Sequence, residues 1–482
     1  MSDHRTIFFL IGNLLAALAL GMLIPALLAA VQQHEDWQVF VTGALVTGFI
    51  AGALILTNRG TLPPLNTKQA FLLTSLSWLA LTGFAALPFA FSALNLSYTD
   101  AFFEAMSGLT TTGATIITDL DAASPGILLW RALLQWFGGI GIIVMAISVL
   151  PMLNVGGMQL FRLESSDTSE KILPRTAQIA GAIAQLYFAV TALCALAYLV
   201  AGMGVFDALA HAMTTIATGG FSTRNDSLAA FDSAAIEAVG VVFMLAASLP
   251  FVAYLQVING KRNALWQDEQ VRVFLTLVVF ISLTLWLYQI GIGMGDSSTA
   301  FLKSLFNTTS ILTGTGYATA DYDNWGPLAL SLFFVMTFIG GCAGSTSCGM
   351  KIFRLQVIVK AGWCYIKQLG QPNGVFVVRY NGQLLEDEVA NSVIAFVMIF
   401  LMSFAVVAVA LSLMGLDTLT ALSAAAAAIA NVGPGLGPVI GPSGTYASLP
   451  DQAKWLLSLA MLLGRLEFLA VLVMFSPSFW RR

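Results

Sequence analysis

The chain has 482 residues, of which 58% are hydrophobic and only 10% are charged, and its mean hydropathy is +0.84. Because a soluble globular chain carries roughly 25% charged residues, these values exclude a soluble multidomain enzyme, and they equally exclude a disordered chain. The net charge of −4 gives no reason to expect nucleic acid as a partner, and four cysteines without a CxxC pair indicate neither a disulfide framework nor a zinc site.

About ten apolar stretches approach the roughly 20 residues that a helix needs to cross a bilayer. They are residues 7–31, 37–56, 70–92, 126–150, 179–203, 232–257, 271–293, 325–343, 390–415 and 453–475. With the N-terminus inside, 16 of the 21 Lys and Arg residues fall on inner loops and ends, and three (Arg224, Lys303 and Lys454) fall on outer loops. The positive-inside rule therefore predicts that both termini are cytoplasmic.

Four outer connections contain a shorter apolar stretch of about 10–13 residues, too short to span a bilayer. They run from Asp100 to Gly113, Asp207 to Gly220, Thr299 to Gly316 and Thr420 to Gly433. Each begins with a residue type that caps helices and stops at glycine, so we expect re-entrant half-helices followed by extended backbone that lines a cavity.

The repeat predicts an all-α polytopic membrane protein made of four span–half-helix–span units and an added N-terminal hairpin. The expected bounds are 1–65 for the hairpin and 66–155, 156–262, 263–370 and 371–482 for the four units. The segment that ends each half-helix, called the filter of that unit, is expected at 110–114, 217–221, 313–317 and 430–435.

The ends of the four half-helices suit a monovalent cation. They read Thr110-Thr111-Thr112-Gly113, Ala217-Thr218-Gly219-Gly220, Thr313-Gly314-Thr315-Gly316 and Ala430-Asn431-Val432-Gly433. In potassium channels, four such loops replace the hydration shell of the ion with backbone carbonyls, and glycine permits the conformations that this needs. Helix C-terminal ends favour cations, whereas divalent ions usually recruit carboxylates. We therefore expect K⁺ ions in the filter and no covalently bound cofactor.

Several motifs extend this pattern over nearly the whole chain: GLTTTGAT at 108–115, QWFGGIGIIV at 135–144, ATGGFST at 217–223, GGCAGST at 340–346, NVGPGLG at 431–437 and LLGRLE at 462–467. In these motifs the sequence resembles the membrane subunit of the Trk/Ktr/HKT superfamily of potassium transporters, most closely the bacterial TrkH/TrkG type. The resemblance implies potassium uptake across the bacterial inner membrane, a homodimer with one pore per protomer, and a cytoplasmic ring of TrkA-type subunits that bind nucleotide and control opening.

The resemblance also implies which atoms bind K⁺. They are the carbonyl oxygens of the two residues before each filter glycine: Thr111 and Thr112, Thr218 and Gly219, Gly314 and Thr315, Asn431 and Val432. In this superfamily, glycine at the positions of Gly113, Gly220, Gly316 and Gly433 goes with potassium selectivity, while serine in the first repeat goes with sodium permeation in some plant members. We hypothesise a preference for K⁺.

Residues 340–350 interrupt an apolar stretch with small residues of low helix propensity, which predicts an unwound loop. By resemblance this is an intramembrane gate, formed by Gly340, Gly341, Gly344, Ser345, Thr346 and Gly349. The family usually has glycines where this chain has Ser347 and Cys348, so we expect a stiffer or differently timed loop. The alternatives are a GxxxG-like packing face and a phosphate-binding loop, which fails because Met350 replaces the required lysine.

Two arginines fall within spans. A charge in the position of Arg465 costs about 2.5–3.5 kcal/mol on insertion scales, so it should face water or a partner. By resemblance it faces the pore and meets the carbonyls of the gating loop; the alternative is a salt bridge to Glu467 or another buried carboxylate. Arg131 is expected to snorkel or pair locally, and Lys351 to meet either the gate or lipid headgroups.

Other polar residues leave alternatives open. Glu104 either holds backbone donors near the filter or faces outer water, and His211 is expected to be a packing histidine. Acidic outer residues would attract cations weakly, although a solvated face is the plainer interpretation of Asp119, Asp121, Asp226, Asp321 and Asp323. The loops at 157–178 and 351–388 are candidate docking surfaces for the cytoplasmic partner.

Two other functional classes remain in competition. A proton- or sodium-coupled symporter of a solute or of K⁺ would normally carry intramembrane carboxylates and a two-part inverted repeat, not four like-oriented units. A membrane enzyme would need a nucleophile–base pair or a His/Cys/Asp cluster within the spans, and the sequence shows none. A non-enzymatic potassium uptake protein is therefore the leading hypothesis.

Overall fold

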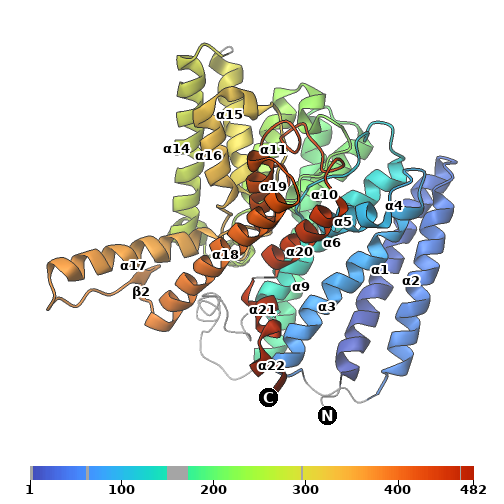
Figure 1. Ribbon diagram of the computed structural model, residues 1–482, viewed down its shortest axis with the longest axis horizontal. Helices are drawn as coiled ribbons and strands as arrows, with labels where there is room; N and C mark the ends of the chain where they lie inside the picture. The colour runs from blue at the N-terminus through green and yellow to red at the C-terminus, as the bar shows by residue number, and fades with distance from the viewer. Residues whose placement is uncertain (1–3, 61–64, 149–171, 295–296, 467, 482) are drawn as a thin grey trace.

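The protein is described by a computed structural model that covers residues 4–60, 65–148, 172–294, 297–466 and 468–481. Within these ranges, seven helical segments are long and apolar enough to cross a membrane. They are α1 (Arg5–Val31), α2 (Trp37–Thr57), α3 (Thr67–Ala85) continued by α4 (Leu87–Phe91), α6 (Pro125–Ser148), α9 (Ile172–Val200), α14 (Glu269–Gly291) and α18 (Asp387–Leu413). The chain is an all-α polytopic membrane protein, as predicted (Figure 1).

Three of the ten expected spans are interrupted. This corrects the expectation of continuous helices at 232–257 and 453–475, whereas the interruption that follows 325–343 agrees with the unwound segment predicted at 340–350. They divide into α11 (Ala234–Ala247) and α12 (Phe251–Ile258), α16 (Pro327–Thr337) and α17 (Ile352–Gly370), and α20 (Asp451–Arg465) and α21 (Leu469–Leu472). The first pair bends by 89°. Pro250 lies at that bend, where its ring disfavours helical backbone at the preceding residue.

Four shorter helices follow long ones, as the repeat predicted. They are α5 (Tyr98–Leu109), α10 (Val205–Ile216), α15 (Ser297–Leu312) and α19 (Thr418–Ala430). The caps differ in part from expectation. The cap of α5 is Ser97, whose side chain accepts from the Asp100 N–H, and α10 begins after Gly204 without a side-chain cap. Asp417 caps α19 as expected, because its carboxylate accepts from the Thr420 N–H at 3.0 Å.

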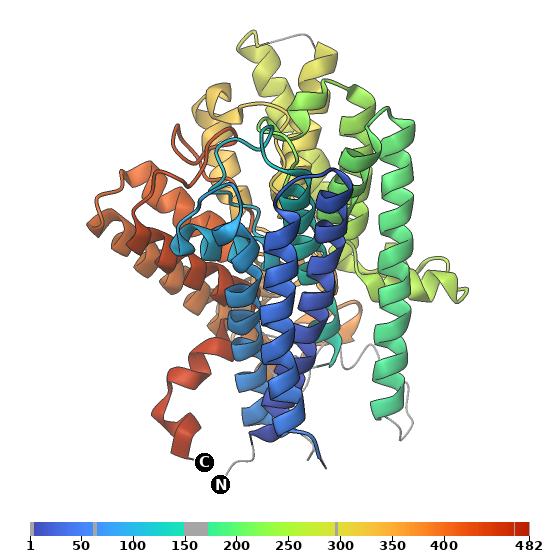
Figure 2. The ribbon, with the colours of Figure 1, turned by 90° about the vertical axis from the view of Figure 1, so that its right-hand side faces the viewer.

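The N-terminal hairpin is a layer of its own at one edge of the molecule. Helices α1 and α2 lie side by side, and α1 also packs on α3 and α6 (Figures 1 and 2). Close packing needs a small residue here, because a Cβ on Gly12 would lie 3.1 Å from the Ala51 carbonyl oxygen on α2. The start of α1 and the short α22 (Pro477–Arg481) lie at the same end of the molecule in both views.

Helix α17 extends away from the helical body, at the left of Figure 1, and carries several exposed apolar side chains. A small antiparallel hairpin of β1 (Arg379–Tyr380) and β2 (Gln383–Leu384) joins it to α18. The remaining short elements lie in connections: η1 (Ser227–Phe231), α13 (Ala264–Gln267), η2 (Tyr322–Trp325) and η3 (Val473–Phe475).

Candidate functional site: a ring of backbone carbonyls and the loop beneath it

Each short helix ends in the same backbone conformation. The second residue before each filter glycine has a positive φ: 52° at Thr111, 51° at Thr218, 72° at Gly314 and 54° at Asn431. The filter glycine itself is also positive: 87° at Gly113, 77° at Gly220, 83° at Gly316 and 100° at Gly433. The residue between them donates its N–H five residues back: Thr112 to Ser107, Gly219 to Thr214, Thr315 to Ser310, and Val432 to Ala427. The four filters are therefore one structural motif repeated.

The four filters contact one another in a closed ring. A Cβ added to a filter glycine would lie against a carbonyl oxygen of the next repeat: Gly113 at 2.2 Å from Gly219, Gly220 at 1.9 Å from Thr315, Gly316 at 2.0 Å from Val432, and Gly433 at 2.6 Å from Thr112. Each glycine is needed both for its positive φ and for this close approach. The contacts run from repeat 1 through 2, 3 and 4 back to 1, so the repeats surround one axis.

Two filter residues are strained. Thr111 and Thr218 are β-branched and fully buried, yet both adopt the left-handed conformation that suits the glycine and asparagine of repeats 3 and 4. Such a conformation costs about 1–3 kcal/mol and persists where the surroundings hold it. The Thr218 hydroxyl donates to the Ala217 carbonyl at 2.7 Å. Strain of this kind gathers at functional sites, and here it lies in the ring itself.

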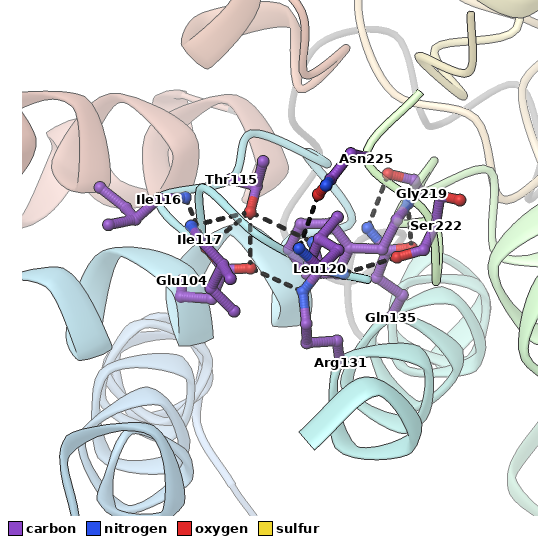
Figure 3. Close-up of polar contacts among 11 residues, drawn as sticks. Glu104, Thr115, Ile116, Ile117, Leu120, Arg131, Gln135, Gly219, Ser222 and Asn225 are labelled. Atoms are coloured by element: carbon purple, nitrogen blue, oxygen red, sulfur yellow. Dashed lines mark hydrogen bonds and ion pairs between the residues drawn. The ribbon is translucent and has the colours of Figure 1, made fainter. Parts of the chain in front are cut away.

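A buried ion pair between Glu104 and Arg131 supports the backbone next to filters 1 and 2 (Figure 3). Glu104 on α5 accepts from Arg131 Nε at 2.7 Å and from the Ile116 N–H at 2.8 Å. Arg131 on α6 also donates to the Ser222 carbonyl at 2.7 Å and to Thr115 Oγ1 at 3.2 Å. Both side chains are at most 1% exposed. Glu104 therefore holds backbone near the filter, and Arg131 pairs locally without snorkelling to the surface.

Gln135, one turn further along α6, clamps filter 2. Its Nε2 donates to the Gly219 carbonyl at 2.6 Å, and its Oε1 accepts from the Phe221 N–H at 3.1 Å (Figure 3). Gln135 stands in the QWFGGIGIIV motif, but no role was predicted for it. The signal is that Arg131 and Gln135 are four positions apart in one span, so two polar side chains share a helix face inside the membrane.

A cavity joins the four filters. All four filter glycines line it, together with loops that include Arg224 and Tyr446. Arg224 pairs with Asp207 at 2.9 Å and with Asp121 at 3.5 Å. Among the other outer acids, burial raises the pKa of Asp323 to about 6, and nearby Asp321 adds to the effect. Asp119, Asp121, Asp321 and Asp323 accept hydrogen bonds from loop residues, so they hold loops, a role that differs from the solvated face named as the plainer interpretation.

The segment 340–350 is an unwound loop, as predicted, and not a helical packing face. A parallel bridge joins Ile339 to Met350 at its two ends. Two glycines with positive φ turn the chain, Gly344 at 77° and Gly349 at 70°. A Cβ on Gly340 would lie 1.7 Å from the Cys348 carbonyl oxygen, so the loop folds closely on itself.

The loop is tied to the bend between α11 and α12. The Cys342 N–H donates to the Ser248 carbonyl at 3.0 Å, and Thr346 Oγ1 donates to the Ala247 carbonyl at 3.0 Å. In return the Phe251 N–H donates to the Gly344 carbonyl at 2.9 Å. Broken helices at membrane depth leave backbone groups without intrahelical partners. Here the backbone groups of the loop and those of the bend between α11 and α12 are hydrogen-bond partners of each other.

The loop lies against the ring of filters. Cys348 Sγ lies 3.6 Å from Thr111 Oγ1 and 4.0 Å from the Thr110 carbonyl oxygen. The same part of the loop approaches filter 3, because a Cβ on Gly314 would lie 3.6 Å from the Cys348 nitrogen. Ser347 Oγ accepts from the Gly341 N–H at 2.8 Å. Ser347 and Cys348 thus make contacts that glycines could not make.

Arg465, 3% exposed at the end of α20, reaches this loop. Its Nη1 donates to the Thr346 carbonyl at 3.4 Å and to Cys348 Sγ, and its Nη2 donates to the Gly138 carbonyl at 2.9 Å. Over the described ranges, no carboxylate lies within ion-pair distance of Arg465; Glu467 lies outside them. Arg465 therefore contacts the loop, as the resemblance implied.

The structure also describes Lys351, His211 and part of the expected docking loop at 157–178. Lys351 Nζ donates to the Ser347 carbonyl, so it meets the loop. His211 is a packing histidine, with Nε2 2.9 Å from Ser222 Oγ and Nδ1 2.8 Å from the Asp207 carbonyl oxygen. Most of the expected docking loop at 157–178 lies outside the described residues. Among the described residues, no group of three His, Cys, Asp or Glu could hold a metal ion.

The chain is similar to known proteins over nearly all of its length. Residues 36–482 match the family model TrkH, described as a cation transport protein. The Trk system potassium uptake protein TrkI of Halomonas elongata is 46% identical over 96% of this chain and 94% of its own length. The TrkH protein of Escherichia coli K12 is 37% identical over 99% of both chains.

A solved structure agrees with these matches. The crystal structure of the potassium transporter TrkH from Vibrio parahaemolyticus superposes with a TM-score of 0.92 at 37% identity, over 99% of this chain and 100% of that one. The fold of the whole chain is thus shared, including the added N-terminal hairpin. The chain belongs to the TrkH family of cation transport proteins.

Proposed function

We propose that this protein takes up potassium through the ring of backbone carbonyls. The observation that carries the proposal is the closed contact of four identical filter backbones, each alternating positive and ordinary φ. Such alternation turns successive carbonyls to one side, so neutral oxygens from four chain segments converge on one axis. The potassium uptake systems named for the relatives support the choice of ion.

The ion ligands in this proposal are the carbonyl oxygens at Thr111, Thr112, Thr218, Gly219, Gly314, Thr315, Asn431 and Val432. The four units at 66–155, 156–262, 263–370 and 371–482 each contribute two. The only nearby buried carboxylate that the structure describes beside filter 1, Glu104, is neutralised by Arg131. A site of neutral dipoles favours a weakly hydrated monovalent cation over a divalent one.

We propose further that the loop at 340–350 is the gate. Its small residues, among them Gly340, Gly341, Ser345 and Thr346, allow it to lie beneath the ring, and Arg465 adds a positive charge there. A buried cation beside the inner entrance raises the energy of K⁺ until the loop moves. The ties to Ala247, Ser248 and Phe251 connect the loop to α12, which faces the polar inner connection.

The assembly remains a proposal drawn from the resemblance. We propose a homodimer in the bacterial inner membrane, surrounded by lipid, with both termini cytoplasmic and a TrkA-type nucleotide-binding ring on the inner side. The excess of Lys and Arg on the inner connections supports this orientation. The exposed apolar side chains of α17, among them Trp363, Tyr365, Ile366 and Leu369, support a protein or lipid contact along that helix.

Isotope uptake into liposomes that contain the purified protein tests the main proposal. We expect K⁺ to suppress uptake of labelled Rb⁺, and an equal concentration of Na⁺ to leave it nearly unchanged. Protein-free liposomes give the background. Equal suppression by the two ions would contradict the proposal of a potassium-selective filter.

A further inference from the structure

Filter 2 differs from the other three in having no side chain on the residue immediately before the filter glycine. Repeats 1, 3 and 4 have the side chains of Thr112, Thr315 and Val432 there, whereas repeat 2 has Gly219. The φ of Gly219 is not positive, so its backbone does not require glycine. The available space does require glycine, because a Cβ on Gly219 would lie 2.3 Å from Cδ, 2.4 Å from Oε1 and 2.7 Å from Nε2 of Gln135. The amide of Gln135 therefore occupies the place of the missing side chain.

Repeats 1 and 3 support their filters with their own hydroxyl groups. Thr110 Oγ1 lies 2.7 Å from Thr112 Oγ1, and Thr313 Oγ1 lies 2.7 Å from Thr315 Oγ1. In repeat 2 the matching residues are Ala217 and Gly219, which have no hydroxyl. The polar support behind filter 2 comes instead from α6, a helix of repeat 1.

The amide of Gln135 has one orientation that satisfies both contacts. The Gly219 carbonyl can only accept and the Phe221 N–H can only donate, so Nε2 must face the first and Oε1 the second. The side chain is fully buried, which removes competing water. Gln135 thus holds filter 2 on both sides of Gly220, because it contacts Gly219 before it (Figure 3) and Phe221 after it. A Cβ on Gly220 would lie 1.9 Å from the Thr315 carbonyl oxygen.

We propose that Gln135 is a positioning residue that sets the preference for K⁺ over Na⁺ by fixing the Gly219 carbonyl in the ring. This inference rests on the proposed potassium filter. Of the four residues that directly precede a filter glycine, Gly219 alone has no Cβ, so its backbone is the least restricted of the four. A carbonyl free to move inward can follow the smaller Na⁺, whereas a carbonyl held by a buried hydrogen bond keeps the spacing that suits K⁺.

The test measures the ratio of K⁺ to Na⁺ permeation in liposomes for Gln135→Leu and Gln135→Met. Both side chains are close to glutamine in size, and neither can donate a hydrogen bond to the Gly219 carbonyl. We expect the ratio to fall by about fivefold or more in both variants, the equivalent of one buried hydrogen bond. A wild-type ratio in either variant would overturn the proposal.

A matched control separates positioning from general loss of a buried glutamine. Gln289 on α14 is also buried and donates to Ser304 Oγ at 2.7 Å, away from the four filter segments. We expect Gln289→Leu to keep the wild-type ratio. If it lowers the ratio as much as Gln135→Leu does, the effect is not specific to the ring and the inference is wrong.

A second pair of variants separates steric fit from selectivity. Gly219→Ala should lower the melting temperature, because its Cβ would overlap the Gln135 amide. Adding Gln135→Ala should restore the melting temperature and leave the ion ratio low. Recovery of the ratio in the double variant would overturn the positioning role. The wild type is measured in parallel. If the wild type does not prefer K⁺ over Na⁺, the proposed function itself fails. If the wild type and Gln135→Leu prefer K⁺ to the same degree, only the inference about Gln135 is refuted.

Discussion

Neutralising Arg465 should increase potassium flux in the absence of any regulator. The guanidinium contacts Cys348 Sγ, and that sulfur lies 4.0 Å from the Thr110 carbonyl oxygen, where filter 1 begins. An ion at this carbonyl would lie roughly 7 Å from the charge, taking the guanidinium–sulfur contact and the sulfur–oxygen distance end to end. At an effective dielectric constant of about 20, two unit charges at that distance repel by roughly 2.4 kcal/mol, which corresponds to about a fiftyfold change in occupancy.

The assay is Rb⁺ uptake into liposomes with purified Arg465→Met, Arg465→Lys and wild-type protein at matched amounts. We expect a rise of tens of fold for methionine and little change for lysine, which keeps the charge. Lys261→Gln removes an exposed charge between α12 and α13 and serves as the control. If the methionine variant shows wild-type flux, or the lysine variant conducts as well as the methionine variant, the electrostatic reasoning is refuted.

Three further outcomes follow from the geometry. Gly113→Ala should lower K⁺ uptake by about tenfold or more, because φ is 87° and the new Cβ would lie 2.2 Å from the Gly219 carbonyl oxygen; unchanged uptake at equal abundance would contradict this. Glu104→Gln leaves Arg131 buried without its counterion at a cost of about 3–5 kcal/mol, so the melting temperature should fall, and it should fall less when Arg131→Met is added. Burial raises the pKa of Asp323 to about 6, above its value of about 3.9 in an unfolded chain. Between these values the folded state binds more protons, so stability should decrease as pH rises from about 4 through 6; melting curves of Asp323→Asn should lack this slope.

The repeated parts of the site could be predicted from the sequence because they depend on local order. A half-helix that stops at glycine leaves a signal within about 15 residues, and four signals at similar intervals reinforce one another. The small residues of 340–350 similarly predict unwound backbone by their low helix propensity. Both features appear in the structure with the expected residues.

The interrupted spans and the supports of the filter could not be located in the same way. Hydropathy averages over a window and ignores the single Pro250 that bends one span by 89°. The contacts of Gln135 with Gly219 and of Arg131 with Ser222 join residues more than 80 positions apart, in different repeats. A charge or an amide within a span indicates that a partner exists, but only the packing of α6 against α10 identifies it.

One helix, α6, connects the four-filter ring with the loop at 340–350. Along α6, Arg131 and Gln135 support filters 1 and 2, and one turn further the Gly138 carbonyl accepts from Arg465 at 2.9 Å. A Cβ on Gly138 would lie 1.9 Å from the Leu109 carbonyl oxygen, so this part of α6 packs directly on the end of α5. A rigid helix that contacts both parts transmits a shift in either one. Release of Arg465 would therefore also shift the contacts of Arg131 and Gln135 with filters 1 and 2, so that movement of the loop at 340–350 and the geometry of the ring are coupled through α6.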